Sequence, residues 1–230
     1  MPEVGFELYK LISVSGEDAV DFLQGQLTQD VTELAVAGRQ LAAWCNPKGR
    51  VITIVRLVDM DPGIGLLVPE SQAEILLARL LMYRLRAKVD IEASDDPVDA
   101  WLEPADSDPA RLIEAGVPWV GAENSEEFTP HMLNLDKLGA ISFTKGCYTG
   151  QEIVARTEHL GKSKRRMMRY RADAPGIAVG ASVSDGDRAV GQVVNVADRD
   201  LLAVTPVELH NQPRVVEGVP IAPQGLPYDI

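Results

Sequence analysis

Apolar and polar residues alternate in several short runs of the first ninety residues, as they do in half-buried β-strands. We expect strands at residues 6–14, 66–68 and 88–93, and a hairpin at residues 41–57. Apolar residues at helical spacing predict one helix that Ser15 caps, with Asp18 in its first turn, and a second that runs from Pro69 to about Leu85. This order of elements predicts an α+β layer.

The pattern changes twice after residue 93. Residues 94–111 are acidic and carry three prolines, a composition typical of a loop or linker. From about residue 167, short β-type runs such as VGQVVNVA and LLAVTPVEL are separated by Gly, Asp and Pro. This spacing predicts a small all-β domain, either a barrel or a sandwich.

Composition narrows the class of protein. The chain has 230 residues, 46% of them hydrophobic, which is enough for a substantial core, and a formal net charge of −12. That charge argues against broad binding to DNA or to anionic membranes. We find no apolar run long enough for a membrane helix and no secretory signal, and the two cysteines favour a reducing compartment, so we expect a cytoplasmic protein.

The stretch FTKGCYTGQEIVAR, residues 143–156, carries the strongest candidate chemistry. Thr149 and Glu152 fit a capping box, which would place Cys147 just before a helix start. A helix N-terminus and the nearby Lys145 would both favour a thiolate, so Cys147 is a candidate reactive or ligand-facing thiol. The alternative is a buried apolar filler, which is our interpretation of Cys45. The histidines lack ligand spacing, so we expect no metal site.

Lys145–Glu152, KGCYTGQE, resembles the K-G-C-Y-x-G-Q-E signature of the YgfZ family of folate-binding, iron–sulfur-related proteins, which is similar to the glycine cleavage T-protein aminomethyltransferase. Residues 16–31, GEDAVDFLQGQLTQDV, resemble the family's N-terminal motif, and residues 45–52, CNPKGRVI, resemble its C-x-x-K-G-R/K stretch. Residues 113–143 resemble the run that leads into the cysteine motif.

The resemblance implies a ferredoxin-like, aminomethyltransferase-type α+β body followed by a small antiparallel β-barrel. The implied N-terminal domain, of folate-binding type, comprises residues 1–93, and the linker at residues 94–111 takes the place of a longer middle domain. Residues 112–160 form a segment that completes the body, and residues 161–230 form the barrel. The implied role is maintenance of iron–sulfur enzymes, including tRNA-modifying ones, with tetrahydrofolate as ligand. The expected folate-binding residues are Tyr9, Trp44, Glu114, Tyr148, Gln151 and Arg156.

Two alternatives stay open beside this role of accessory factor. One is a folate-dependent one-carbon transferase, but Thr53 and Ile54 stand where aminomethyltransferases carry an acidic pair, and neither can act as a carboxylate. The other is a module that binds tRNA directly.

Residues 162–171 concentrate six positive charges in an otherwise acidic chain. We expect Arg165, Arg166 and Arg169 to form an exposed patch for an anion, such as a folate glutamate tail, a phosphate or an acidic partner. The alternative is a solvated strand edge that carries charge.

Overall fold

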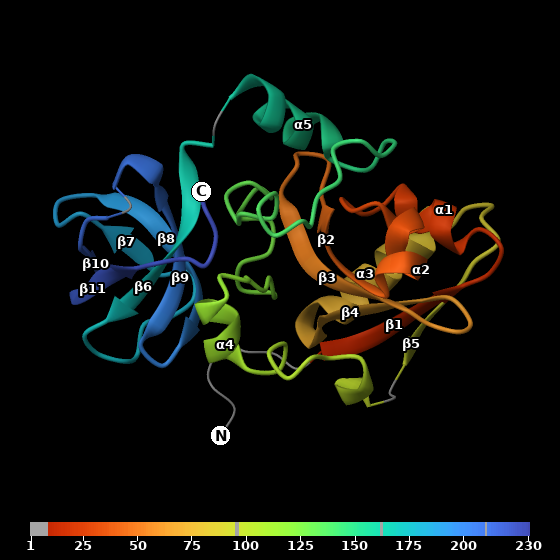
Figure 1. Cartoon of the computed structure of the whole chain (residues 1–230), viewed down its shortest axis with the longest axis horizontal. Helices are drawn as coiled ribbons and strands as arrows, with labels where there is room; N and C mark the ends of the chain where they lie inside the picture. Colours follow the sequence, from red (N-terminus) through yellow and green to blue (C-terminus); the bar gives the residue numbers. More distant parts are fainter. Residues whose placement is uncertain (1–8, 95–96, 162, 210) are drawn as a thin grey trace.

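The computed structural model describes residues 9–94, 97–161, 163–209 and 211–230. The chain forms an α+β body and a β-barrel that lie side by side, with an irregular segment between them (Figure 1). Within the described residues, no helix is both long and apolar enough to cross a membrane.

The body is built on a five-stranded sheet in the order β2-β3-β4-β1-β5, in which every neighbouring pair is antiparallel. Its strands are β1 (Tyr9–Ser15), β2 (Arg39–Cys45), β3 (Val51–Asp59), β4 (Ile64–Pro69) and β5 (Asp90–Ser94). Its helices are α1 (Ala19–Gln24), α2 (Leu34–Ala37) and α3 (Glu70–Tyr83), with a short 3-10 turn, η1 (Val31–Glu33). Apolar side chains of α1 and α3, such as Leu23 and Leu76, share one core with Trp44 and Leu57 of the sheet.

A second core joins the body to the barrel. It contains Ala43 and Ile54 from β2 and β3, residues of the irregular segment such as Trp119, and Val194 and Leu202 from the barrel. The segment includes η2 (Val98–Ala100) and α4 (Pro109–Glu114) and runs to α5 (Gln151–Leu160). Because one continuous core spans sheet, segment and barrel, the two halves hold each other in place.

The barrel is closed, with strand order β10-β11-β6-β9-β8-β7. Its strands are β6 (Arg165–Ala172), β7 (Ser182–Ser184), β8 (Ala189–Ala197), β9 (Asp200–Pro206), β10 (Arg214–Val216) and β11 (Val219–Gln224), with η3 (Val207–Leu209) after β9. The predicted fold class is therefore confirmed, and the all-β region is a barrel.

One predicted helix start is wrong. We expected Ser15 to cap the first helix, but β1 extends through Ser15 and α1 begins at Ala19. Asp18 occupies the cap position without capping, because its carboxylate accepts the backbone N–H of Lys88 at 2.7 Å. The carboxylate therefore ties the helix start to the chain just before β5.

Candidate functional site

Three segments that are distant in sequence meet around the cysteine motif. They are residues 25–30 after α1, the turn Asn46–Arg50 between β2 and β3, and the loop at residues 139–150 before α5. The residues that make these contacts come from the stretches that carry the family resemblance. The motifs therefore form one site, which we call the thiol loop site.

Thr28 fastens the first segment to the loop. Its hydroxyl donates to the carbonyl of Ala140 at 2.7 Å and accepts the backbone N–H of Ala43 at 2.8 Å. The backbone N–H of Ser142 donates to the Thr28 carbonyl at 2.9 Å. Thr28 is fully buried, so these bonds are shielded from water and hold the loop against β2.

Lys145 is the second fastening. Its ammonium donates to the carbonyls of Leu27 at 2.7 Å and Gln29 at 2.8 Å, and it lies 5.3 Å from the ring centroid of Tyr148. Burial lowers the pKa of the Lys145 amine to about 8, although the Asp30 carboxylate opposes this shift. We expected Lys145 to place its charge beside Cys147, but the ammonium points into the joint between the loop and residues 27–29.

Two glycines let the turn pack on the start of α5. A Cβ on Gly150 would lie 2.5 Å from the carbonyl oxygen of Asn46, and a Cβ on Gly49 would lie 2.8 Å from the Cβ of Ile153. Both glycines also have positive φ, +84° for Gly150 and +68° for Gly49. Residues with side chains fit neither position.

The predicted capping box is also wrong, because the close packing of the turn on α5 puts Gly150, and not Thr149, at the start of the helix. The N-cap of α5 is Gly150 in the left-handed region, with no side-chain cap, and the helix begins at Gln151. Thr149 is therefore outside the helix. The carboxylate of Glu152 accepts a hydrogen bond from Arg156 at 2.6 Å, one turn further along.

The two cysteines lie in opposite environments. Cys147 is exposed, next to Gly146, around which a Cβ would meet nothing within 4 Å. Cys45 is buried in the core between sheet and barrel, and burial raises the pKa of its thiol to about 12. Cys45 therefore fills the core as expected, and the accessible thiol is that of Cys147.

The expected folate-binding residues do not lie together. Tyr148, a residue of the loop itself, is buried, and desolvation raises the pKa of its phenol, whereas Trp44 is buried in the core of the body. Glu114 is exposed at the end of α4, whereas Gln151 and Arg156 lie on α5. Tyr9 is buried with its hydroxyl bonded to Arg56 Nη1 at 2.5 Å.

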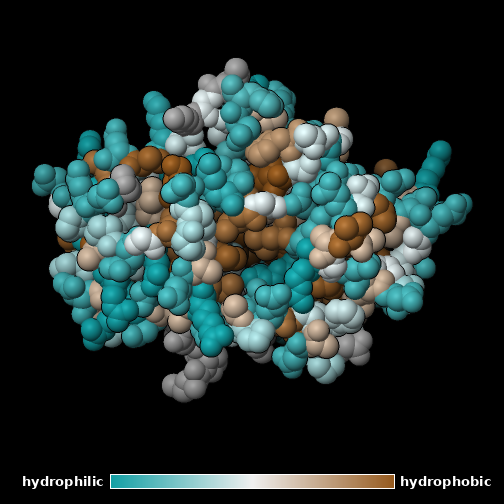
Figure 2. Space-filling model, in the orientation of Figure 1, coloured by the Kyte–Doolittle hydropathy of each residue, from teal (hydrophilic) through white to brown (hydrophobic). Residues whose placement is uncertain are grey.

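Arg56 and its neighbours line a cavity of about 240 Å³ that sequence analysis missed. Asp106, at 2.8 Å from Arg56 Nε, and Trp101, Leu41 and Arg39 share the lining. Elsewhere on the surface, Figure 2 shows a hollow with apolar side chains between the barrel and the body. The sequence offers no local signal for the cavity around Arg56, because its polar residues come from strands and from the region assigned to the linker.

The expected arginine patch does not exist as one surface. Arg166 points inward and is buried, and its two terminal nitrogens reach the Asp136 carboxylate at 2.5 Å and 3.0 Å. Arg169 pairs with Asp200 at 3.7 Å, and only Arg165 of the three is exposed. The reason is the period of two in β6, which turns Arg166 to the opposite face from Arg165 and Arg169. Lys162, also in the basic run, lies outside the described residues.

One residue of α5 and two of the irregular segment form a group of potential metal ligands. Ligand atoms of His131, Asp136 and Glu158 lie within 4.8 Å of one another. His131 Nε2 lies 3.1 Å from the Glu158 carboxylate, and the Asp136 carboxylate is bound at both oxygens by Arg166. The guanidinium charge beside Asp136 opposes a cation, so this group is better described as two hydrogen-bonded pairs.

Thr53 and Ile54, which stand where aminomethyltransferases carry an acidic pair, are both buried. Thr53 is fully buried, and its hydroxyl donates to the carbonyl of Val120 at 3.0 Å. Ile54 is buried in the core shared with the barrel. No carboxylate stands at either position to hold a reacting amine.

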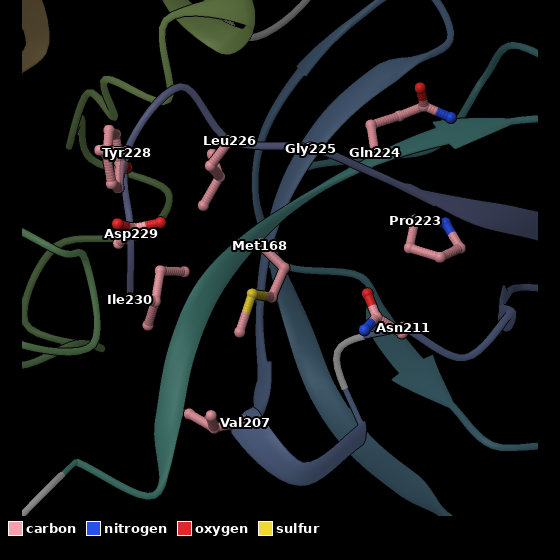
Figure 3. Close-up of a pocket in the computed structure, with 10 residues that line it drawn as sticks. All are labelled: Met168, Val207, Asn211, Pro223, Gln224, Gly225, Leu226, Tyr228, Asp229 and Ile230. Carbon is pink, nitrogen blue, oxygen red and sulfur yellow. The ribbon is translucent and has the colours of Figure 1, made fainter.

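The C-terminal residues link the barrel to the irregular segment through hydrogen bonds of Tyr228. Tyr228 donates to the carbonyl of Gly116 at 2.7 Å and accepts from Asn134 at 3.4 Å. Figure 3 shows this stretch beside β6, with Met168 and Leu226 around a cavity of about 320 Å³. The cavity is separate in its lining from the one around Arg56.

A search with protein-family models finds no match to this chain. Among individual proteins, tRNA-modifying protein YgfZ of Photobacterium profundum is 30% identical, over 93% of this chain and 88% of the relative. Those of Hamiltonella defensa and Klebsiella pneumoniae are each 30% identical, over 68% and 69% of this chain and over 66% and 68% of the relative, respectively.

A solved structure shows the same fold. The crystal structure of glycine cleavage system aminomethyltransferase T from Bartonella henselae superposes with a TM-score of 0.71, over 95% of this chain and 83% of that chain, at 13% identity. The fold predicted from the motifs is confirmed by this likeness. Together with the relatives above, the three motifs that meet at the thiol loop site establish that this chain belongs to the YgfZ family.

Proposed function

We propose that this protein acts in tRNA modification as a folate-linked accessory factor that maintains iron–sulfur enzymes through Cys147. The observation that carries the proposal is the presentation of Cys147: an exposed thiol on a loop that Lys145 and Thr28 fasten to the body. The names of the relatives, tRNA-modifying proteins, support the link to tRNA.

The chemistry of the thiol fits such a role. Cysteine thiolates are the usual protein ligands of iron in iron–sulfur clusters, and reactive cysteines lie in accessible positions. Gly146 leaves the surface beside Cys147 open, so another protein can approach the sulfur closely. Cys45 is enclosed by the core and is unsuited to such contact.

The cavity around Arg56 offers groups suited to a pterin ring, whereas the folate-binding residues that we expected from sequence do not lie together. A pterin is a flat ring with amino groups that donate hydrogen bonds, and Asp106 supplies an acceptor beside Arg56. Trp101 and Leu41 supply apolar surface in the same lining. We therefore propose that tetrahydrofolate binds there.

A transferase activity is not favoured by the geometry. The interior positions of Thr53 and Ile54 hold no carboxylate, and the Thr53 hydroxyl is bonded to Val120. We expect no aminomethyl transfer to tetrahydrofolate from a lipoyl carrier protein. Turnover above that of a heat-inactivated sample would contradict this.

Complementation tests the role of Cys147. Cells that lack the gene are supplied with wild type, Cys147→Ser or Cys45→Ser, and their thiolated tRNA nucleosides are quantified by mass spectrometry. We expect wild type and Cys45→Ser to restore the nucleosides, with Cys147→Ser restoring at most about a tenth. Full restoration by Cys147→Ser, at equal protein level, would refute the role of the thiol.

Calorimetric titration with tetrahydrofolate tests the cavity. Trp101→Ala should weaken binding about tenfold, because Trp101 is the aromatic residue among those that line the cavity in the described part of the chain. The matched control is Tyr83→Ala, which removes an exposed aromatic side chain outside the cavity. Equal affinities for both variants would place the folate elsewhere.

A further inference from the structure

One end of the barrel carries a groove of about 820 Å³ that the proposed function leaves unused. It is formed by the start of β6, the start of β8 and the end of β9 with η3. The residues that matter are Lys164, Arg165, Arg188, Val190, Pro206 and Leu209, and we call their surface the barrel-end groove.

Two cations of this groove, Lys164 and Arg165, are not paired with a carboxylate, unlike the other arginines of β6. On β6, Arg166 pairs with Asp136, and Arg169 and Arg171 pair with Asp200. No carboxylate in the described part of the chain pairs with Lys164 or Arg165, and Arg165 donates instead to the neutral carbonyl of Val190.

Arg188, directly before β8, adds a third cation to the lining. Its side chain is 78% exposed, and its contact with Asp185, at 3.2 Å, is a surface pair between near neighbours. Such pairs contribute little, so the guanidinium is available to a ligand. Among the described residues that line the groove, Glu208 is the one acid, which leaves them a formal excess of positive charge in a chain of net charge −12.

The lining of the groove also contains apolar residues. Val190, Pro206 and Leu209 belong to it, so the surface combines apolar side chains with cations. This combination matches a nucleotide strand, in which bases and sugars present apolar faces and phosphates present negative charge. The volume exceeds what an isolated phosphate fills.

We propose that the barrel-end groove binds an RNA strand, with Lys164, Arg165 and Arg188 on its phosphates. This inference rests on the proposed role in tRNA modification, and it assigns the RNA contact to a surface on the barrel rather than to the thiol loop site. Because the contacts are to phosphates, binding should be strongly weakened by salt and should depend little on sequence.

The test measures fluorescence anisotropy of a fluorescein-labelled tRNA transcript with the full chain at several salt concentrations. Lys164→Ala/Arg165→Ala should weaken binding at least about tenfold at low salt and reduce the slope of log K against log salt by about 2. The matched control, Arg111→Ala/Arg171→Ala, removes two exposed cations that pair with Asp108 and Asp200, and it should keep wild-type affinity.

Three outcomes would overturn the proposal: no binding by wild type at low salt, an equal loss in the control variant, or displacement of the transcript by AMP at comparable concentration. Thermal melting of each variant confirms that it is folded. Cys147→Ser should bind the transcript as wild type does, so a failure of the groove and a failure of the proposed thiol function are separately visible.

Discussion

Gly49 and Gly150 lie so close that a Cβ added to Gly150 would stand 3.1 Å from the Cα of Gly49. This approach brings the β2–β3 turn against the first turn of α5, about a hundred residues later in the chain. It also fixes where α5 starts and therefore where the loop that carries Cys147 must end. The contact between the two glycines therefore brings two sequence motifs, residues 45–52 and residues 145–152, into one site.

Gly150→Ala should destabilise the protein by about 2 kcal/mol or more, because the new Cβ meets the Asn46 carbonyl at 2.5 Å and φ is +84°. Urea unfolding of wild type and variant measures the change. Gly146→Ala is the control, since a Cβ there meets nothing within 4 Å, and its effect should stay within about 0.5 kcal/mol. Equal effects would mean that the close approach is absent.

The thiols should react at very different rates. In the native protein, one thiol per chain, Cys147, should react quickly with a thiol reagent, because it is exposed. Cys45 should react only after denaturation, since it is buried and its pKa is raised to about 12. Cys147→Ser should remove the fast phase, and a fast phase that persists in this variant would contradict the assignment.

Lys145 should make stability depend on alkaline pH. Its pKa is lowered to about 8 in the folded protein, whereas an unfolded lysine titrates near 10.5. Between these values the unfolded chain binds more protons, so the Lys145 contribution to the free energy of unfolding should rise as pH rises. Urea unfolding from pH 7 to pH 10.5 measures the free energy of unfolding of wild type and of Lys145→Met. The difference between the two proteins at each pH isolates the contribution of Lys145. A difference that stays constant with pH would show that the amine titrates normally.

Arg166→Ala should cost about 3–5 kcal/mol, because it leaves the Asp136 carboxylate unpaired in a nearly buried position. Arg171→Ala, on the same strand but exposed and paired with Asp200, should cost less than about 1 kcal/mol. Unfolding free energies of the two variants make the comparison, and similar costs would place Arg166 at the surface after all.

The sequence predicted the elements whose cause is local. Alternation gave the strands of the sheet, and the spacing of Gly, Asp and Pro gave the barrel, because both patterns reflect burial on one face of a strand. The basic run failed as a patch because its partners, Asp136 and Asp200, come from other parts of the chain. The prediction of a capping box at Thr149 was wrong because the helix start is set by a contact between Gly150 and Asn46, and the local sequence around neither residue indicates that contact.

The contacts of the thiol loop site have a consequence for folding kinetics. Lys145 is 118 residues from Leu27 and 116 from Gln29, and Thr28 is 112 residues from Ala140. Contacts of such long range form late, because the entropy of closing the intervening chain must be overcome first. We therefore expect the loop to take its final shape only on a completed body, so that a partly folded chain does not yet hold Cys147 in its final position.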